Sequence, residues 1–104
     1  MVILPVQSDN NEIRYTKIID LYGRDFIFTF DWNDREQFWY MTVQEIDQTL
    51  IRGLVGIKVV VNWQLNRMVR GDQFPKGVLM AYNNTNTDPQ FDNLKLGFVL
   101  ENEI

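Results

Sequence analysis

Aromatic side chains occupy every second position of residues 26–32, and this alternation constrains the fold more than any other feature of the chain. Successive side chains of a β-strand point to opposite faces, so a period of two gathers the aromatic residues on one side. Smaller or polar residues stand between them. The alternating aromatic positions are Phe26, Phe28, Phe30 and Trp32, with Ile27, Thr29 and Asp31 in between. The pattern predicts a strand whose aromatic face is buried.

A polar turn and a second strand follow directly. Residues 33–36, Asn-Asp-Arg-Glu, are typical of a turn, because Asn and Asp side chains bond to their own backbone. Residues 38–45 are expected to return as the second strand of a hairpin. We expect its core face to carry Trp39, Met41 and Val43 and its partly covered face to carry Phe38 and Tyr40.

The remainder of the chain predicts further short strands separated by turns. Residues 13–21 alternate with one wet face, and Gly23 supplies the turn at residues 22–25. Residues 62–68 fit neither period, so a short helical turn remains open there. The other expected strands are residues 50–51, 57–61, 78–82 and 96–100, and the expected loops are residues 69–76 and 83–89.

These elements predict an all-β fold, which we expect to be a single domain over residues 1–104. Seven to eight short strands with regular turns are typical of a small antiparallel barrel or sandwich. A barrel closes its edges, whereas a sandwich leaves edges that can pair with a neighbour. The pattern does not decide between the two.

Composition narrows the classes of function. The net charge is −4 and no basic run is present, which argues against stable nucleic-acid binding. No apolar stretch approaches the length of a membrane span, and the N-terminus lacks the pattern of a signal peptide. The chain has no His and no Cys, so the commonest general base and the usual zinc ligands are missing. We therefore predict no enzyme activity, no catalytic residue and no metal or cofactor.

The aromatic residues permit two further interpretations. Trp39 and the Phe26 to Phe30 stripe are expected in the core, since so short a chain needs their area. Tyr40 and Trp63 are possible interface residues, because Tyr and Trp are enriched where proteins meet. Exposed aromatic residues beside an Asn/Asp-rich loop also fit a carbohydrate-binding module, which is the alternative function.

Four motifs in order resemble a known family. They are Phe28-x-Phe30-x-Trp32-Asn33-x-Arg35-x-x-x-Trp39-Tyr40, Leu65-x-Arg67, Phe74-Pro75-x-Gly77-x-Leu79 and Asp88-Pro89-x-Phe91-Asp92-Asn93-Leu94. Together they are similar to the baseplate plug family of tailed phages, found in a small contractile cyanophage among others, over about residues 12–100. The chain departs from the family pattern at residues 74–76, where Phe74-Pro75-Lys76 replaces the Pro-Pro or Leu-Pro before the glycine, and at Lys95, where the family usually has Gly.

The resemblance implies a structural virion protein of the phage tail baseplate that plugs or links the tail tube and the central hub. It implies contact with other baseplate, hub and tube proteins, a homo-oligomer of three or six copies, and a contractile tail assembled in the host cytoplasm. It implies no catalytic residue. The family-motif positions carried over as structural are Trp32, Asn33, Arg35, Trp39, Tyr40, Pro75, Gly77, Phe91, Asp92 and Leu94.

Overall fold

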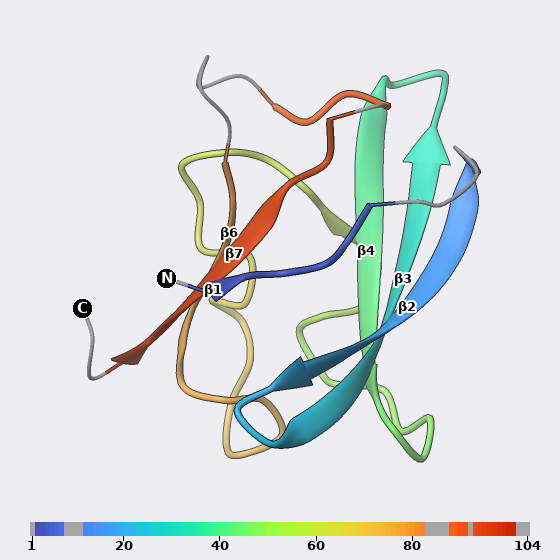
Figure 1. Cartoon of the computed structure of the whole chain (residues 1–104). Helices are drawn as coiled ribbons and strands as arrows, with labels where there is room; N and C mark the ends of the chain where they lie inside the picture. Colours follow the sequence, from blue (N-terminus) through green and yellow to red (C-terminus); the bar gives the residue numbers. More distant parts are fainter. Residues whose placement is uncertain (1, 8–11, 83–87, 92, 102–104) are drawn as a thin grey trace.

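The computed structural model describes residues 2–7, 12–82, 88–91 and 93–101, and in this part of the chain the fold is all-β (Figure 1). The seven strands are β1 (Val2–Ile3), β2 (Arg14–Leu21), β3 (Arg24–Asn33), β4 (Phe38–Glu45), β5 (Ile57–Lys58), β6 (Gly77–Ala81) and β7 (Leu96–Leu100). The prediction of seven to eight short strands is confirmed. Most of the expected polar loop, residues 83–87, lies outside the described residues, as does Asp92.

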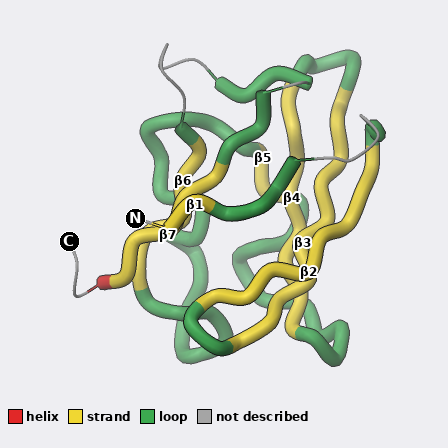
Figure 2. Tube along the Cα trace, viewed as in Figure 1, coloured by secondary structure: helices red, strands yellow, loops and turns green. Residues whose placement is uncertain are grey.

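The strands form two antiparallel sheets (Figure 2). The larger sheet has the order β2-β3-β4-β5, and the smaller one has the order β1-β7-β6. Over the described residues the sheets do not close into a barrel. Of the two expected architectures, the chain therefore adopts the one with two separate sheets, and these sheets share one hydrophobic core.

Two hairpins build the larger sheet. Tyr22 and Gly23 alone connect β2 to β3, and both have positive φ, 54° and 88°, which suits the tight turn of a two-residue hairpin. This turn is shorter than the four residues expected from the sequence. The turn between β3 and β4 spans residues 34–37 and sets Trp32 opposite Trp39. The predicted hairpin is thus confirmed.

The aromatic stripe lies in the core, as predicted. Phe26, Phe28 and Phe30 of β3 are fully buried, and Trp32 at the end of the strand is half-buried against the core. The inward face of β4 is buried as well, through Trp39, Met41 and Val43. The smaller sheet contributes Leu79, Ala81, Leu96 and Phe98 to the same core.

The middle of the chain contains less strand than expected. Leu50 makes only a single bridge to Gln44, and the strand predicted over residues 57–61 is reduced to β5. Gly53 and Gly56 have φ of 95° and 61°, so the chain turns between the Leu50 bridge and β5, and Asn62, with φ of 58°, turns it again after residue 61. Residues 62–68 form successive tight turns and no helix. Among the described residues, no helix has the length and apolar character needed to cross a membrane.

Candidate functional site

Three family-motif aromatic residues meet at one end of the larger sheet. The ring centroids of Trp32 and Trp39 are 5.4 Å apart, and those of Trp39 and Phe91 are 5.8 Å apart with the rings nearly parallel. Trp32 also packs edge-on against Phe91, with centroids 5.6 Å apart. The motif residues of the hairpin and of the 88–94 segment therefore form one aromatic cluster, although about 50 residues separate them in sequence.

Hydrogen bonds fix the 88–94 segment over this cluster. Trp39 Nε1 donates to the carbonyl oxygen of Gln90 at 2.8 Å, and the Asp88 carboxylate accepts from the Val61 backbone N–H at 2.9 Å. Leu94 is buried in the core next to β7. Phe91 is thus packed against the tryptophan pair of the larger sheet, and Leu94 lies in the core. The role of Asp92 lies outside the described residues.

The tip of the β3–β4 hairpin is held by a polar network. The Asn33 side chain accepts from the Glu36 backbone N–H and donates to the Glu36 carboxylate, both at 3.0 Å. Tyr40 donates its hydroxyl hydrogen to the same carboxylate at 2.6 Å. This hydrogen bond to Glu36 raises the pKa of the Tyr40 hydroxyl above its usual value. Asn33 and Tyr40 therefore stabilise the turn from its two sides.

Arg35, the remaining motif residue of the hairpin tip, does not join this network. Its side chain is exposed, and within the described part of the chain it makes no ion pair and no ring contact. The Glu36 carboxylate is bonded to Asn33.

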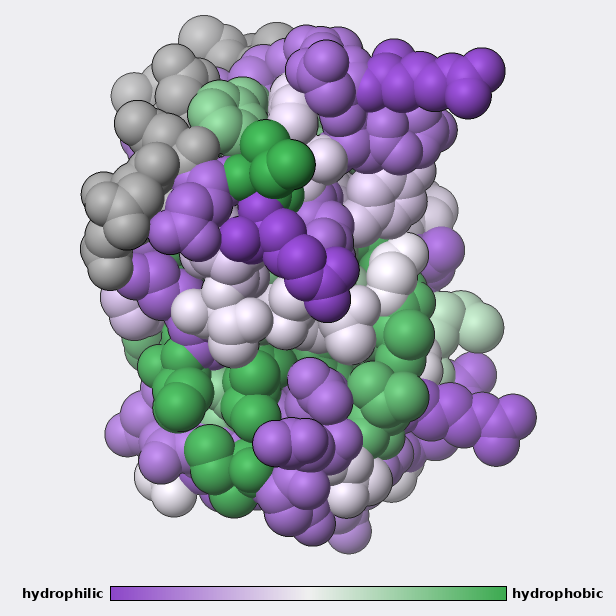
Figure 3. All heavy atoms as spheres, turned by 90° about the vertical axis from the view of Figure 1, so that its right-hand side faces the viewer, coloured by the Kyte–Doolittle hydropathy of each residue, from purple (hydrophilic) through white to green (hydrophobic). Residues whose placement is uncertain are grey.

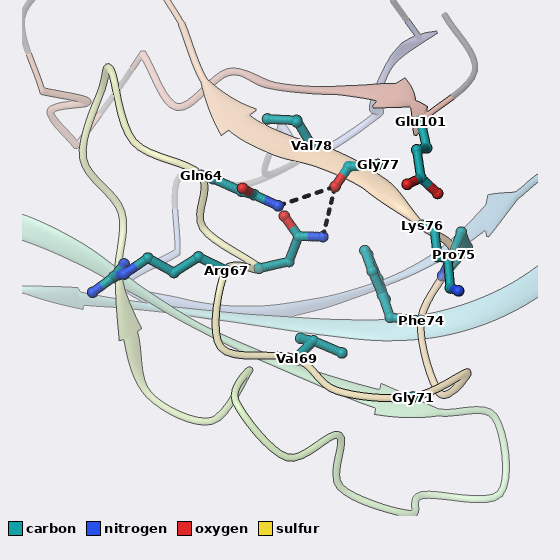
Figure 4. A pocket seen from close by; sticks show the side chains of 11 residues that line it. Gln64, Arg67, Val69, Gly71, Phe74, Pro75, Lys76, Gly77, Val78 and Glu101 are labelled. Carbon is teal, nitrogen blue, oxygen red and sulfur yellow. Dashed lines mark hydrogen bonds between the residues drawn. The ribbon is translucent and has the colours of Figure 1, made fainter. Parts of the chain in front are cut away.

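The second group of motif residues, Pro75 and Gly77, lies at the start of β6. A Cβ atom at Gly77 would overlap the Val99 carbonyl oxygen and lie 2.8 Å from the Phe98 ring, so β6 and β7 approach closely only because this residue is glycine. The carbonyl oxygen of Gly77 accepts hydrogen bonds from the Gln64 and Asn66 side chains at 3.2 and 3.1 Å (Figure 4). These bonds attach the preceding loop to the strand.

Asn66 is a structural residue of this loop that the sequence did not reveal. It is a buried polar residue, with 7% of its surface exposed, and its Oδ1 accepts from the Leu79 backbone N–H at 3.0 Å. Leu65 donates its N–H to the Leu79 carbonyl oxygen at 2.8 Å. The Asn66 amide thus replaces a strand neighbour along the outer edge of β6. A polar residue in a segment of undefined period gives no sequence signal for such a role.

A polar pocket of about 310 Å³ lies between this loop and β6. Figure 4 shows Arg67 at one end of the pocket and Lys76 with Glu101 at the other. The described residues contain no group of three His, Cys, Asp or Glu side chains that could hold a metal ion. The charged lining residues of the pocket, Arg67, Lys76 and Glu101, are of the kinds found on any protein surface, and they do not by themselves indicate a catalytic site.

An apolar groove of about 340 Å³ lies on the other side of Gln64. Trp63 forms one wall with 49% of its surface exposed, and the Arg67 guanidinium stacks over its ring at 4.2 Å. We name this surface the Trp63 groove; its lining residues are Val61, Asn62, Trp63, Gln64, Val78, Met80, Ala81 and Tyr82. A held, half-exposed tryptophan above an apolar floor is typical of a protein interface.

The two possible interface residues do not form one surface. Tyr40 is half-buried on the outer face of β4, beside Lys58 of β5. Trp63 lies in the loop before β6, as a wall of the Trp63 groove, which Tyr40 does not line. Of the two, Trp63 is the residue that lines a surface groove. Met80 and Tyr82 line the same groove, and the sequence did not single them out.

The site as a whole consists of packed motif residues and two surface pockets. The motif residues hold the loops of this small β protein in fixed positions. The chain belongs to the cyanophage baseplate Pam3 plug gp18 family, whose model matches residues 1–101. It is therefore a phage baseplate plug protein, a structural protein of the viral tail that associates with other baseplate components. No curated protein matches the chain.

Proposed function

We propose that this chain plugs or links the tail tube and the central hub of a contractile phage tail, in several symmetry-related copies. The family match over nearly the whole chain carries this proposal. The position also fits a chain whose motif residues serve packing and turn geometry. Three or six copies are expected around the tail axis, assembled in the host cytoplasm before the tail is complete. Neither catalysis nor a cofactor has a part in this role.

The Trp63 groove is the surface that we propose meets a neighbouring hub or tube protein. Apolar side chains form its floor, and burial of a half-exposed Trp ring on binding removes a large apolar area from water. Arg67 already holds the ring, so little side-chain freedom is lost when a partner covers it. The groove thus combines the two properties typical of an interface hot spot.

The net charge of −4 supports a position next to the DNA path without stable nucleic-acid binding. Like charges repel, so an acidic protein near the tail axis lets DNA pass without adhering to it. The carbohydrate-binding alternative has no such support. Trp39 is buried with its indole N–H bonded to Gln90, and Trp32 packs within the aromatic cluster, so neither is available as a flat sugar platform.

Co-expression with the tube and hub proteins of the same phage tests the proposal. We expect the tagged chain to co-purify with at least one of them, identified by mass spectrometry. Trp63→Glu places a charge in the groove and is expected to weaken the complex at least tenfold, since a charge has no partner in an apolar contact.

Ile46→Glu is the matched control, because Ile46 is also about half exposed, at 55%, and lies in the turn after β4. It should leave the complex unchanged. Absence of every tube and hub protein from the purified material would contradict the proposed function. Equal losses for both variants would remove the groove from the interface.

A further inference from the structure

The edges of the two sheets are protected to different degrees. An uncovered strand edge presents unpaired N–H and C=O groups, to which another strand can bind. On the outer edge of β6, Leu65 and Asn66 satisfy Leu79, Gln64 and Asn66 satisfy Gly77, and Val61 bridges to Ala81. β1 and β5 are edge strands of two residues each. β2, with eight residues, is the long edge strand that remains (Figure 1).

The backbone of β2 has no strand partner on its outer side among the described residues. Trp32 donates its N–H to the Ile13 carbonyl oxygen, and the hydrogen-bonded pairs alternate from there along the hairpin. The odd-numbered residues of β2 thus bond to β3, and the even-numbered ones direct N–H and C=O away from it. In the described part of the chain, these outward groups have no backbone partner; they belong to Arg14, Thr16, Ile18 and Asp20.

The side chains along this edge include an exposed apolar row. Ile18 has 64% of its surface exposed and lies opposite Ile27 of β3 on the outer face of the larger sheet. Gln44 interrupts the row on β4, and Leu50, also exposed, lies beyond it. Figure 3 shows apolar side chains gathered over the lower half of this face. Within the described sheet the row ends at Ile18, because β2 is the edge strand.

We propose that β2 pairs antiparallel with β2 of a second copy of this chain, with Ile18 opposite Ile18 of that copy. This register uses the outward N–H and C=O groups of Thr16, Ile18 and Asp20 on both strands. It also joins the two apolar rows into one that crosses the shared edge. Two four-stranded sheets then become one continuous sheet of eight strands.

Charge favours this register over the one centred on Lys17. When Ile18 pairs with Ile18 of the second copy, Thr16 lies opposite Asp20 of that copy. Arg14 is then the diagonal neighbour of that Asp20, at about 7–8 Å between backbones. A register centred on Lys17 would instead set Lys17 directly against Lys17, and like charges in opposite positions destabilise a strand pair. The arrangement of Arg14, Lys17 and Asp20 therefore fits a second copy in the Ile18-centred register.

A two-fold pairing also bears on copy number. Three chains in one ring cannot all pair through a two-fold contact, whereas six chains can assemble as three pairs. The choice of six copies over three rests on the proposed function, but the pairing itself is a property of the purified protein. The failure of one is therefore distinguishable from the failure of the other.

Single-cysteine variants test the register, since the chain contains no Cys. Directly opposed residues of a hydrogen-bonded pair lie about 5.5 Å apart between Cα atoms, within the range that a disulfide spans. We expect Ile18→Cys to form a disulfide-linked dimer on mild oxidation at least tenfold faster than Lys17→Cys. Thr29→Cys, on the same face of the adjacent inner strand β3, should not cross-link.

Sedimentation of the unmodified protein and of Thr16→Pro completes the test. Proline removes one outward N–H while remaining tolerated on an edge strand, so the dimer should weaken at least tenfold and the circular dichroism spectrum should stay β-type. A monomer at millimolar concentration, faster cross-linking of Lys17→Cys, or a dimer unaffected by Thr16→Pro would each overturn the proposal. So would purified tails in which Ile18→Cys cross-links only to a different protein.

Discussion

Trp39 shows how a single residue can organise two distant parts of this chain. Its ring packs against Trp32 within the hairpin and against Phe91 from the C-terminal region. Its indole N–H is bonded to the Gln90 carbonyl oxygen, so a buried polar atom is satisfied by the loop that it holds. Tyr15 completes the cluster from β2, and burial raises the pKa of its hydroxyl to about 12.

Trp39→Ala is expected to lower the free energy of unfolding by about 3–5 kcal/mol, as is typical for loss of a buried aromatic side chain. The reasons are the cavity left in the core and the unpaired Gln90 carbonyl oxygen. Chemical denaturation of the purified variant measures the loss. Trp63→Ala serves as the control and should cost less than about 1 kcal/mol, because that residue is half exposed.

Should Trp39→Ala fail to fold, Trp39→Phe retains the ring and removes the indole N–H. It is expected to cost less than the alanine variant. A Trp39→Ala protein as stable as the unmodified chain would contradict the cluster as a structural centre.

At the scale of the elements, strong periodicity was predictive and irregular segments were not. The alternation of residues 26–32 and 38–43 predicted the hairpin and its buried face, because alternation over six or seven residues indicates a β-strand with one buried face. Residues 57–69 were not predictable in the same way. Their shape depends on hydrogen bonds such as that from Leu65 to Leu79, whose partners are distant in sequence.

The candidate site was also predictable only in part. The motif aromatic residues were identified from the sequence, and the structure brings Trp32, Trp39 and Phe91 together. The groove beside Trp63 was not predictable beyond Trp63 itself, because Met80 and Tyr82 reach it through the pairing of β6 with β7. Likewise, no sequence pattern showed that the β6 edge is covered while the β2 edge has no strand partner among the described residues.

Asn66→Ala is expected to lower the free energy of unfolding by about 1–3 kcal/mol, the typical cost of a buried N–H left without a partner. The Leu79 amide should exchange with solvent faster in this variant, because Asn66 Oδ1 is its acceptor. Hydrogen exchange followed by NMR provides the measurement. Arg70→Ala, an exposed residue of the following loop, should change neither quantity; protection of Leu79 that survives in Asn66→Ala would show that the edge is closed by other means.

At the scale of the whole molecule, the two sheets differ in how they face their surroundings. The smaller sheet is closed at β6 by side-chain amides and carries the Trp63 groove beside that edge. The larger sheet ends in β2, whose outer edge has no strand partner in the part of the chain that the structure describes. We propose the groove as the contact with a different baseplate protein and the β2 edge as the contact with a second copy of the chain.

A cryo-electron microscopy reconstruction of the phage tail tests the central claim most directly. The proposed role predicts density for this two-sheet fold on or near the tail axis, where the tube meets the hub, with the Trp63 groove covered by a neighbouring protein. Density for the fold only at the tail periphery, or virions that lack the chain altogether, would contradict it.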